Sequence, residues 1–161
     1  MIMLRDAKLF LFSLPPLLLS LLHCSPNGTA PMPAILCPAI KITDLPADSL
    51  RRDGFALKTI ALHGDTLVLE ITHGGGCKEH DYALFMSPSV FAESYPVQAS
   101  LYLQHNANGD LCKALLQPKL CFDLRPIAEQ YRKAYGALGP IRLNVHDYAA
   151  GQKLEALYEP R

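Results

Sequence analysis

This chain lacks tryptophan, a net charge, and, beyond its first two dozen residues, any apolar run long enough to cross a membrane. Its 15 basic and 15 acidic side chains balance, which argues against nucleic-acid binding because such binding needs a basic footprint. The same balance argues against electrostatic docking on anionic lipid. Without tryptophan a sugar-stacking site is not expected, and without a Gly-x-Ser-x-Gly motif a serine nucleophile is not expected either.

The first 23 residues are typical of an export signal. Arg5 and Lys8 precede an apolar run over residues 9–22 that is interrupted by Pro15 and Pro16. This run is shorter than the roughly 20 residues of a membrane-spanning helix, and two adjacent prolines would break such a helix. We therefore expect residues 1–23 to be a signal peptide.

The signal ends in Leu21-Leu22-His23-Cys24, which resembles the lipobox of bacterial lipoproteins. We expect cleavage before Cys24 and lipidation of that cysteine, although His23 departs from the small residue usual before it. The alternative is ordinary cleavage near residues 28–30 and secretion. The prediction is a protein of the bacterial cell envelope that faces the periplasm or the exterior and meets the membrane through its lipid anchor only.

The rest of the chain divides into a tether and one domain. Residues 24–38 are rich in proline and predict an extended tether. Residues 39–161 are long enough for a single domain with one core.

Alternating or short apolar runs at hairpin spacing predict strands in this domain. In residues 66–72, for example, Leu67, Leu69 and Ile71 face one way and polar residues the other. The preceding His63-Gly64-Asp65 predicts a hairpin turn, because glycine supplies a positive φ. The expected strands are 55–62, 66–72, 80–86, 97–104, 113–124, 141–148 and 153–158.

Only residues 126–136 are expected to be helical. Pro126 suits the first turn, Ile127 and Tyr131 follow helical spacing, and Gly136 ends the pattern. About seven short strands and one short helix predict a mainly β fold, either an antiparallel β-sandwich or an open barrel.

Two short segments place a cysteine near a histidine: GGGCKEH at residues 74–80 and HNANGDLC at residues 105–112. Zinc prefers four nitrogen or sulfur ligands, and thiolate with imidazole also suits copper. The metal hypothesis assigns one ion to Cys77, His80, His105 and Cys112. Six residues separate the second pair, so only folding could bring both of its members to one ion.

The competing hypothesis is a disulfide between Cys77 and Cys112. An oxidising compartment favours it, and closing such a loop contributes on the order of 4 kcal/mol in the chain-entropy model. Cys37 and Cys121 would then form a second pair.

A third hypothesis uses Cys77 as a thiol nucleophile with His80 or His105 as its base. An exported thiol tends to be oxidised, so we assign no catalytic residue.

Three motifs resemble those of a family of bacterial exported proteins and lipoproteins. They are Gly-Gly-Cys-x-x-His at residues 75–80, Glu-Ser-x-Pro-Val-Gln at 93–98 and His-x-Ala-x-Gly-Asp-x-Cys at 105–112. The resemblance covers residues 55–158. It implies an envelope location and carries no activity with it.

The sequence thus favours an exported or lipid-anchored, non-enzymatic envelope module stapled by the Cys77–Cys112 disulfide, without a cofactor. Its partner would be an envelope protein or a small ligand. A zinc- or copper-binding envelope protein is the second interpretation, and a thiol-dependent enzyme is the third.

Overall fold

The computed structural model describes residues 36–161, apart from residues 51–52 and 148–149. The predicted signal peptide, the lipidation site Cys24 and most of the predicted tether lie outside the described residues.

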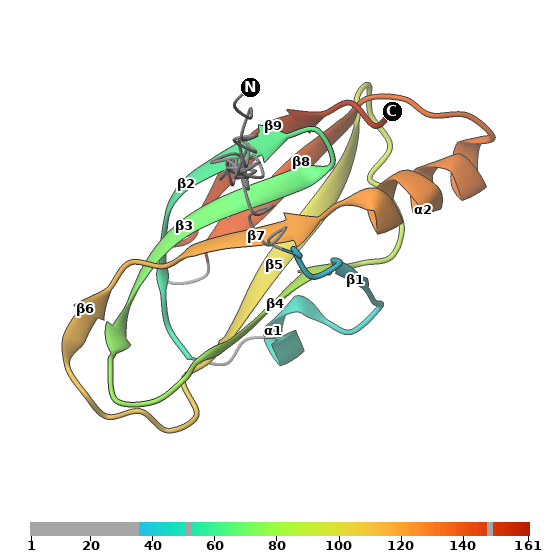
Figure 1. Ribbon diagram of the computed structural model, residues 1–161. Helices are drawn as coiled ribbons and strands as arrows, with labels where there is room; N and C mark the ends of the chain where they lie inside the picture. Colours follow the sequence, from blue (N-terminus) through green and yellow to red (C-terminus); the bar gives the residue numbers. More distant parts are fainter. Residues whose placement is uncertain (1–35, 51–52, 148–149) are drawn as a thin grey trace, which may run out of the picture. The chain divides into compact units, whose positions relative to one another are not determined.

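Two β-sheets form the domain (Figure 1). The larger sheet has the order β1-β4-β5-β8-β9 and consists of β1 (Lys41–Ile42), β4 (Asp81–Met86), β5 (Val97–Asn106), β8 (Ile141–Asp147) and β9 (Gln152–Tyr158). In the smaller sheet the long strand β3 pairs on one side with β2 and on the other with β6 and β7 in succession. Its strands are β2 (Ala56–His63), β3 (Thr66–Gly75), β6 (Ala114–Leu116) and β7 (Lys119–Asp123).

This architecture confirms the predicted mainly β fold, and the larger sheet adds parallel pairing that the sequence did not indicate. β1 pairs with β4 and β5 pairs with β8 in parallel, whereas the remaining strand pairs are antiparallel. Parallel neighbours need a long crossover. Between β5 and β8 the chain supplies one by passing through β6 and β7 of the other sheet and then through a helix.

The single strand predicted at residues 113–124 is wrong, because the segment forms both β6 and β7. The break falls at Pro118, which has no backbone N–H to give to a ladder. Its carbonyl still accepts a hydrogen bond from the N–H of Ile71 at 3.3 Å. Both halves of the segment therefore stay paired with β3.

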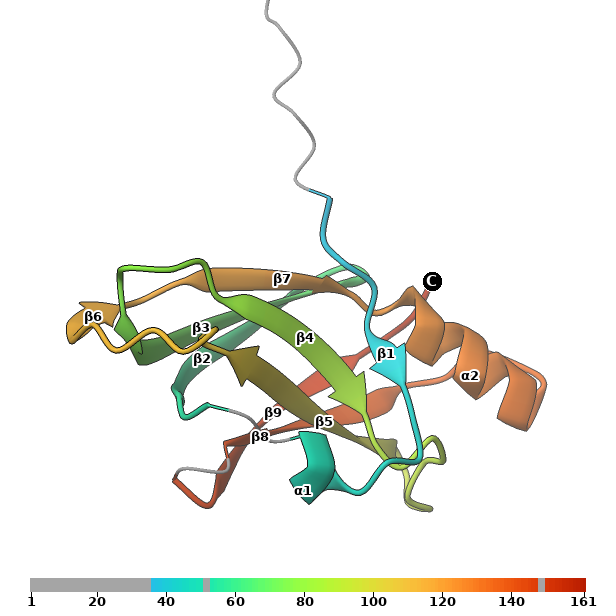
Figure 2. The same cartoon turned by 90° about the horizontal axis from the view of Figure 1, so that it is seen from below.

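Two helices flank the sheets. α2 (Arg125–Tyr135) carries a proline in its first turn and ends at Gly136, whose φ of 77° gives the left-handed cap expected of glycine. The short α1 (Ala47–Leu50) was not predicted; it buries Leu50. α2 and β6 lie at opposite ends of the sheets in both views (Figures 1 and 2).

The core lies between the sheets and is built from the buried phase of the alternating strands. On β3 the buried positions are Leu67, Leu69 and Ile71, and on β5 they include Leu101 and Leu103. The other large apolar side chains that are fully buried include Leu84, Met86, Phe122, Leu124, Ile127, Ile141, Leu143 and Tyr158.

A disulfide attaches the N-terminal end of the described chain to this core. Cys37 is bonded to Cys121 of β7, with their Cα atoms 5.2 Å apart. The neighbouring backbone also bonds to β7, since Ile40 donates to the carbonyl of Asp123 and Asp123 donates to the carbonyl of Pro38.

Candidate metal centre

His73 and His105 extend the two buried faces of the sandwich by one further inward position each. On β3 the buried series Leu67, Leu69, Ile71 continues at His73, which is 5% exposed, and on β5 the corresponding series ends at His105, which is 1% exposed. Because the two strands belong to different sheets, their histidines meet between the layers. His73 pairs with Leu116 of β6, and β6 lies at one end of the domain (Figure 2).

His80 completes a cluster of imidazoles at this end. It lies in the loop between β3 and β4, and its side chain is 3% exposed. Ring centroids are 4.2 Å apart for His73 and His105, 4.7 Å for His73 and His80, and 5.0 Å for His80 and His105. One ring nitrogen from each residue lies within 4.8 Å of the other two. We call His73, His80 and His105 the histidine cluster.

One nitrogen of each ring faces an oxygen that only accepts hydrogen bonds. His73 donates from Nδ1 to the carbonyl of Gly74 at 2.8 Å, and His105 donates from Nδ1 to the carbonyl of Gly54 at 3.3 Å. His80 donates from Nε2 to Oδ2 of Asp110 at 3.2 Å. Protein metal sites use this arrangement, because a hydrogen bond on one ring nitrogen orients the other toward the ion.

The remaining nitrogens then carry lone pairs, and two of them point at each other. Nδ1 of His80 lies 2.8 Å from Nε2 of His105. With these tautomers the two lone pairs face each other, and a cation between them, either one additional proton or a metal ion, makes the contact favourable. In the other tautomer His105 carries its proton on Nε2, donates to His80 and gives up the 3.3 Å contact with Gly54. Ligand nitrogens on a tetrahedral zinc ion stand roughly 3.3 Å apart, so a small spreading of this pair admits the ion.

Tyr82 closes the cluster from β4. Its hydroxyl donates to Nε2 of His73 at 2.6 Å, and its ring stacks on His105, its cross-strand partner, at 5.2 Å between centroids. Burial raises the pKa of Tyr82. The pKa of His105 is lowered, first by burial and then by the neighbouring charge of His73. The surroundings of His105 therefore favour its neutral imidazole, the form that binds metal.

Asp110 holds His80 from the loop after β5. Oδ1 of Asp110 accepts the backbone N–H of Cys112 at 2.9 Å, and Oδ2 accepts those of Cys77 at 2.8 Å and Lys78 at 3.0 Å. These bonds, the one from Cys112 foremost, keep the pKa of Asp110 far below its usual value. The carboxylate that orients His80 is thus ionised at neutral pH.

The backbone leaves no room for a side chain beside His80. Gly75 has a φ of 146°, and a Cβ built there would lie 2.5 Å from Cε1 of His80 and 2.7 Å from its Nε2. Glycine is therefore required at this position for both conformation and space.

The structure joins Cys77 to Cys112, with their Cα atoms 5.9 Å apart. The proposed four-ligand site is thereby corrected, because sulfurs bonded to each other are not thiolate ligands. His80 and His105 do converge, and their third partner is His73. The same bond leaves no Cys77 thiol to act as the predicted nucleophile.

The sequence interpretation missed His73 because the predicted strand stopped at residue 72, one position short of it. It missed Tyr82 and Asp110 because only the fold carries them to the histidines. A signal for His73 was present, since the residue continues the inward phase of Leu67, Leu69 and Ile71.

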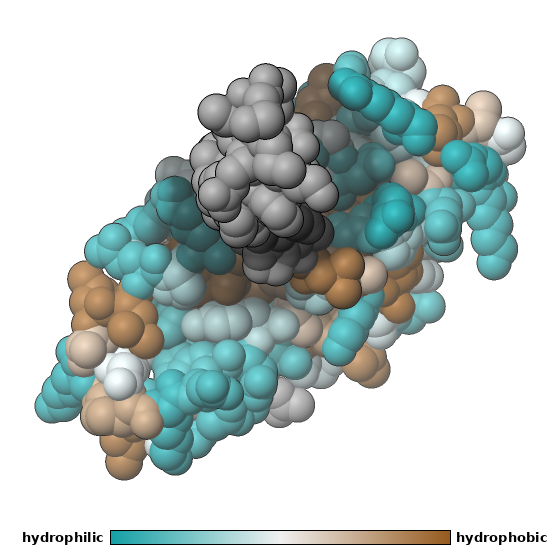
Figure 3. Space-filling model, in the orientation of Figure 1, coloured by the Kyte–Doolittle hydropathy of each residue, from teal (hydrophilic) through white to brown (hydrophobic). Residues whose placement is uncertain are grey.

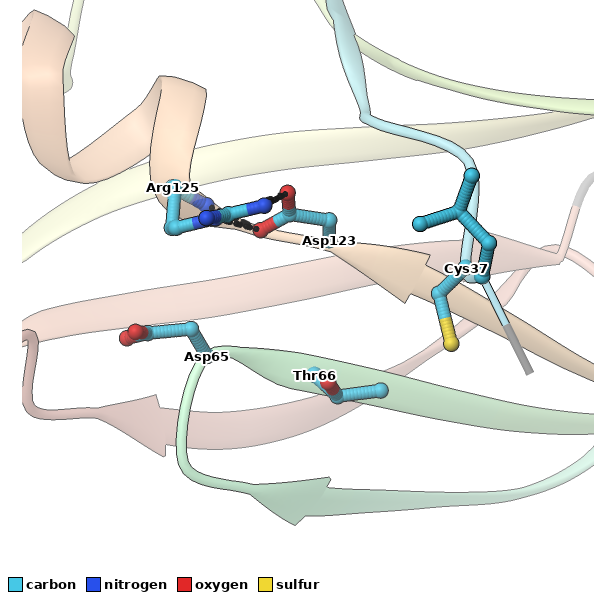
Figure 4. Close-up of a pocket in the computed structure, with 6 residues that line it drawn as sticks. Cys37, Asp65, Thr66, Asp123 and Arg125 are labelled. Atoms are coloured by element: carbon cyan, nitrogen blue, oxygen red, sulfur yellow. Dashed lines mark hydrogen bonds and ion pairs between the residues drawn. The ribbon is translucent and has the colours of Figure 1, made fainter. Parts of the chain in front are cut away.

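A separate hollow of about 390 Å³ lies where the N-terminal end meets β7 and the β2–β3 turn (Figure 4). Arg125 and Asp123 on its wall bind each other, with Nη2 and Oδ2 at 2.7 Å. Asp65 accepts a hydrogen bond from the Tyr158 hydroxyl at 2.8 Å. The charged groups of the hollow are thus already engaged, and the histidine cluster is the better candidate site.

The outer surface beside the cluster is partly apolar. Figure 3 shows hydrophobic side chains gathered at the end of the molecule that carries β6. There Leu115 of β6 is 70% exposed, and Leu111 in the loop before it is 90% exposed. No helix in the described ranges is both long and apolar enough to cross a membrane.

No protein-family model and no curated protein matches the chain. Among solved structures it is similar to a NigD-like immunity protein from Bacteroides caccae, with 22% identity over 78% of this chain and 64% of that one and a TM-score of 0.53. It is also similar to a toxin-related protein from Parabacteroides distasonis, with 21% identity over 78% and 61% of the two chains and a TM-score of 0.55. The chain spans less than two thirds of the length of these structures, and at such identities the likeness shows the fold alone.

Proposed function

We propose that this protein is an extracytoplasmic, non-enzymatic module that holds one divalent zinc or copper ion on the histidine cluster. The observation that carries the proposal is the 2.8 Å contact between Nδ1 of His80 and Nε2 of His105. With the opposite nitrogen of each ring donating to Asp110 or Gly54, the two inner nitrogens present lone pairs to one ion. Imidazole is a ligand that both zinc and copper accept.

Burial supports holding the ion over using it in catalysis. Catalytic zinc sites keep a position open for water or substrate, whereas structural sites are closed by protein. All three imidazoles are almost fully buried. The Tyr82 hydroxyl, next to Nε2 of His73, offers an oxygen for the fourth position.

An export route is supported by the cysteines. Two disulfides, Cys37–Cys121 and Cys77–Cys112, staple one small domain, and such bonds persist in oxidising compartments outside the cytoplasm. The lipobox-like sequence ending in Cys24 supports a lipid anchor in the bacterial envelope as the finer proposal. Both features suit a module displayed on a membrane surface.

The metal proposal is tested by titrating zinc and copper(II) into the purified chain with both disulfides intact, using calorimetry and elemental analysis. We expect about one ion per chain, and nitrogen couplings in the paramagnetic resonance spectrum of the copper form. His73→Gln should weaken binding by tenfold or more. His63→Gln is the matched control, since His63 is exposed in the β2–β3 hairpin.

Retained near-ultraviolet circular dichroism would show that the His73→Gln variant is folded. A wild-type chain that takes up no ion, or a folded His73→Gln chain that binds as tightly as wild type, would reject the metal proposal. In the first case a proton, and not a metal ion, would bridge His80 and His105.

A further inference from the structure

We propose that Cys77, Cys112 and Asp110 form a second metal centre, which the disulfide closes and a dithiol reductant opens. One ligand atom from each of these three residues lies within 4.8 Å of the others. Cys77 is exposed and Cys112 is half-buried, so a reductant reaches the bond from solvent. The centre shares Asp110 with the histidine cluster, where Oδ2 of Asp110 bonds to His80, but it takes no ligand from the three histidines.

Asp110 keeps capacity for a metal ion. Each oxygen of a carboxylate offers about two lone-pair positions. Oδ2 uses its positions on Cys77, Lys78 and His80, whereas Oδ1 accepts one hydrogen bond, from Cys112. Oδ1 therefore retains a lone pair for an ion beside the two sulfurs.

The two loops stay together without the disulfide. Nζ of Lys78 donates to the carbonyls of Asn108 and Gly109 at 2.8 and 3.1 Å, and Nδ2 of Asn108 donates to the carbonyl of Glu79 at 2.9 Å. Gly75 of β3 pairs with Ala114 of β6, and each of these residues is two positions from one of the cysteines. Reduction therefore leaves the two thiols near each other and near Asp110.

The change in position that the ion requires is small. Two thiolates on one zinc ion stand roughly 3.8 Å apart. The Cα atoms of Cys77 and Cys112 are 5.9 Å apart, so rotation of the side chains separates the sulfurs far enough. With Oδ1 of Asp110 as the third ligand, a water molecule is expected in the fourth position.

The metal centre forms in two steps, reduction of the disulfide and binding of the ion. A dithiol reductant gives two electrons and two protons to the Cys77–Cys112 bond, which breaks into two thiols while the reductant closes into its own disulfide. A divalent zinc-class ion then binds both sulfurs as thiolates and releases their two protons to solvent. Thiolate ligands select zinc, cadmium and copper(I) over harder ions.

The test compares the full chain before and after reduction with a phosphine, which breaks each disulfide with one water molecule and becomes a phosphine oxide. Zinc uptake is measured by elemental analysis after dialysis, and cadmium uptake by the absorption of the cadmium–thiolate bond. We expect reduction to add about one ion per chain and to produce that absorption.

Matched variants show which cysteines bind the additional ion. In the Cys37→Ser/Cys121→Ser chain, whose other disulfide is kept, the gain should persist, and in the Cys77→Ser/Cys112→Ser chain it should vanish. His73→Gln should keep the gain even though it loses the ion of the histidine cluster. Failure of the two proposals is therefore distinguishable.

Absence of the added ion and of the thiolate absorption in reduced wild type overturns this inference. So does an equal gain in the Cys77→Ser/Cys112→Ser chain, which would place the new site at Cys37 and Cys121. Circular dichroism shows whether each reduced chain is still folded. If the Cys77→Ser/Cys112→Ser chain has unfolded, the cadmium absorption of the folded, reduced Cys37→Ser/Cys121→Ser chain decides whether Cys77 and Cys112 bind the added ion.

Discussion

His73 and His105 face each other from different sheets with ring centroids 4.2 Å apart. His105 is the last inward-facing residue of β5. His73 is the last but one on β3, where only Gly75 follows it on the inward face. The sandwich therefore ends in imidazoles where further aliphatic packing would be expected.

Asp110→Asn should weaken metal binding by the histidine cluster about 10- to 100-fold, the usual effect of losing an outer-shell partner of a ligating histidine. The amide keeps the shape but not the charge that orients His80. Calorimetric titration with zinc measures the change. Glu79→Gln is the control, because Glu79 is an exposed acidic residue next to His80 in the β3–β4 loop. Equal affinity of the Asp110→Asn and wild-type chains would contradict the assigned role.

Gly75→Ala should lower thermal stability and abolish metal uptake together. The added methyl group meets the His80 ring at 2.5 Å, and the φ of 146° is one that alanine rarely adopts. Gly54→Ala is the control, since a Cβ there has nothing within 4 Å. Melting curves and zinc titrations of both variants test this, and an unaltered histidine cluster in Gly75→Ala would show that the loop is more adaptable than described.

The metal-free protein should lose stability as the pH falls below the ordinary histidine value of 6.5. His146 stacks on Tyr102, and its pKa is lowered first by burial and then by the charge of Lys153. The unfolded chain then binds protons that the folded chain refuses, so the stability is complete above pH 6.5 and declines toward the lower folded pKa.

His146→Phe should reduce this dependence, because phenylalanine keeps the stacking on Tyr102 but takes up no proton. Urea unfolding one pH unit above and one below 6.5 measures the slope. His63→Gln, at an exposed histidine, should leave the slope unchanged. An identical slope in His146→Phe and wild type would mean that His146 does not contribute.

Cys24→Ser should release the protein from membranes into the soluble fraction. A lipid chain supplies the membrane affinity of an anchored protein, and the residues after Cys24 are proline-rich without a long apolar run. Fractionation of cells that express both forms is the measurement. A wild-type protein that is already soluble and begins beyond Cys24 would exclude the anchor.

Local sequence patterns predicted most strands and one helix boundary well. The predicted turn at Gly64 and Asp65 joins β2 and β3, with Gly64 at the positive φ of 60° that the prediction relied on. Gly136 ends α2 as expected. These features depend only on residues that are neighbours in the chain, so they can be predicted from the sequence.

Pairing over long distances was less predictable. The even number of cysteines beyond Cys24 suggested the Cys37–Cys121 and Cys77–Cys112 pairs that the structure contains. The sequence could not decide between a disulfide and a metal at Cys77, because cysteine serves both. Nor could it reveal the parallel pairing of β5 with β8, which follows from the crossover path and not from the composition of either strand.

The sequence by itself determined the strand faces, the turns and the compatibility of the chain with export, because alternation, glycine at positive φ and apolar run length are local properties. Only the tertiary structure decided which histidines form a site. His73 and His105 lie on strands of different sheets, and both side chains point inward. They become neighbours because the two sheets pack their apolar faces together. His80 joins them because the pairing of β3 with β6 and the Cys77–Cys112 bond bring Asp110 against its ring.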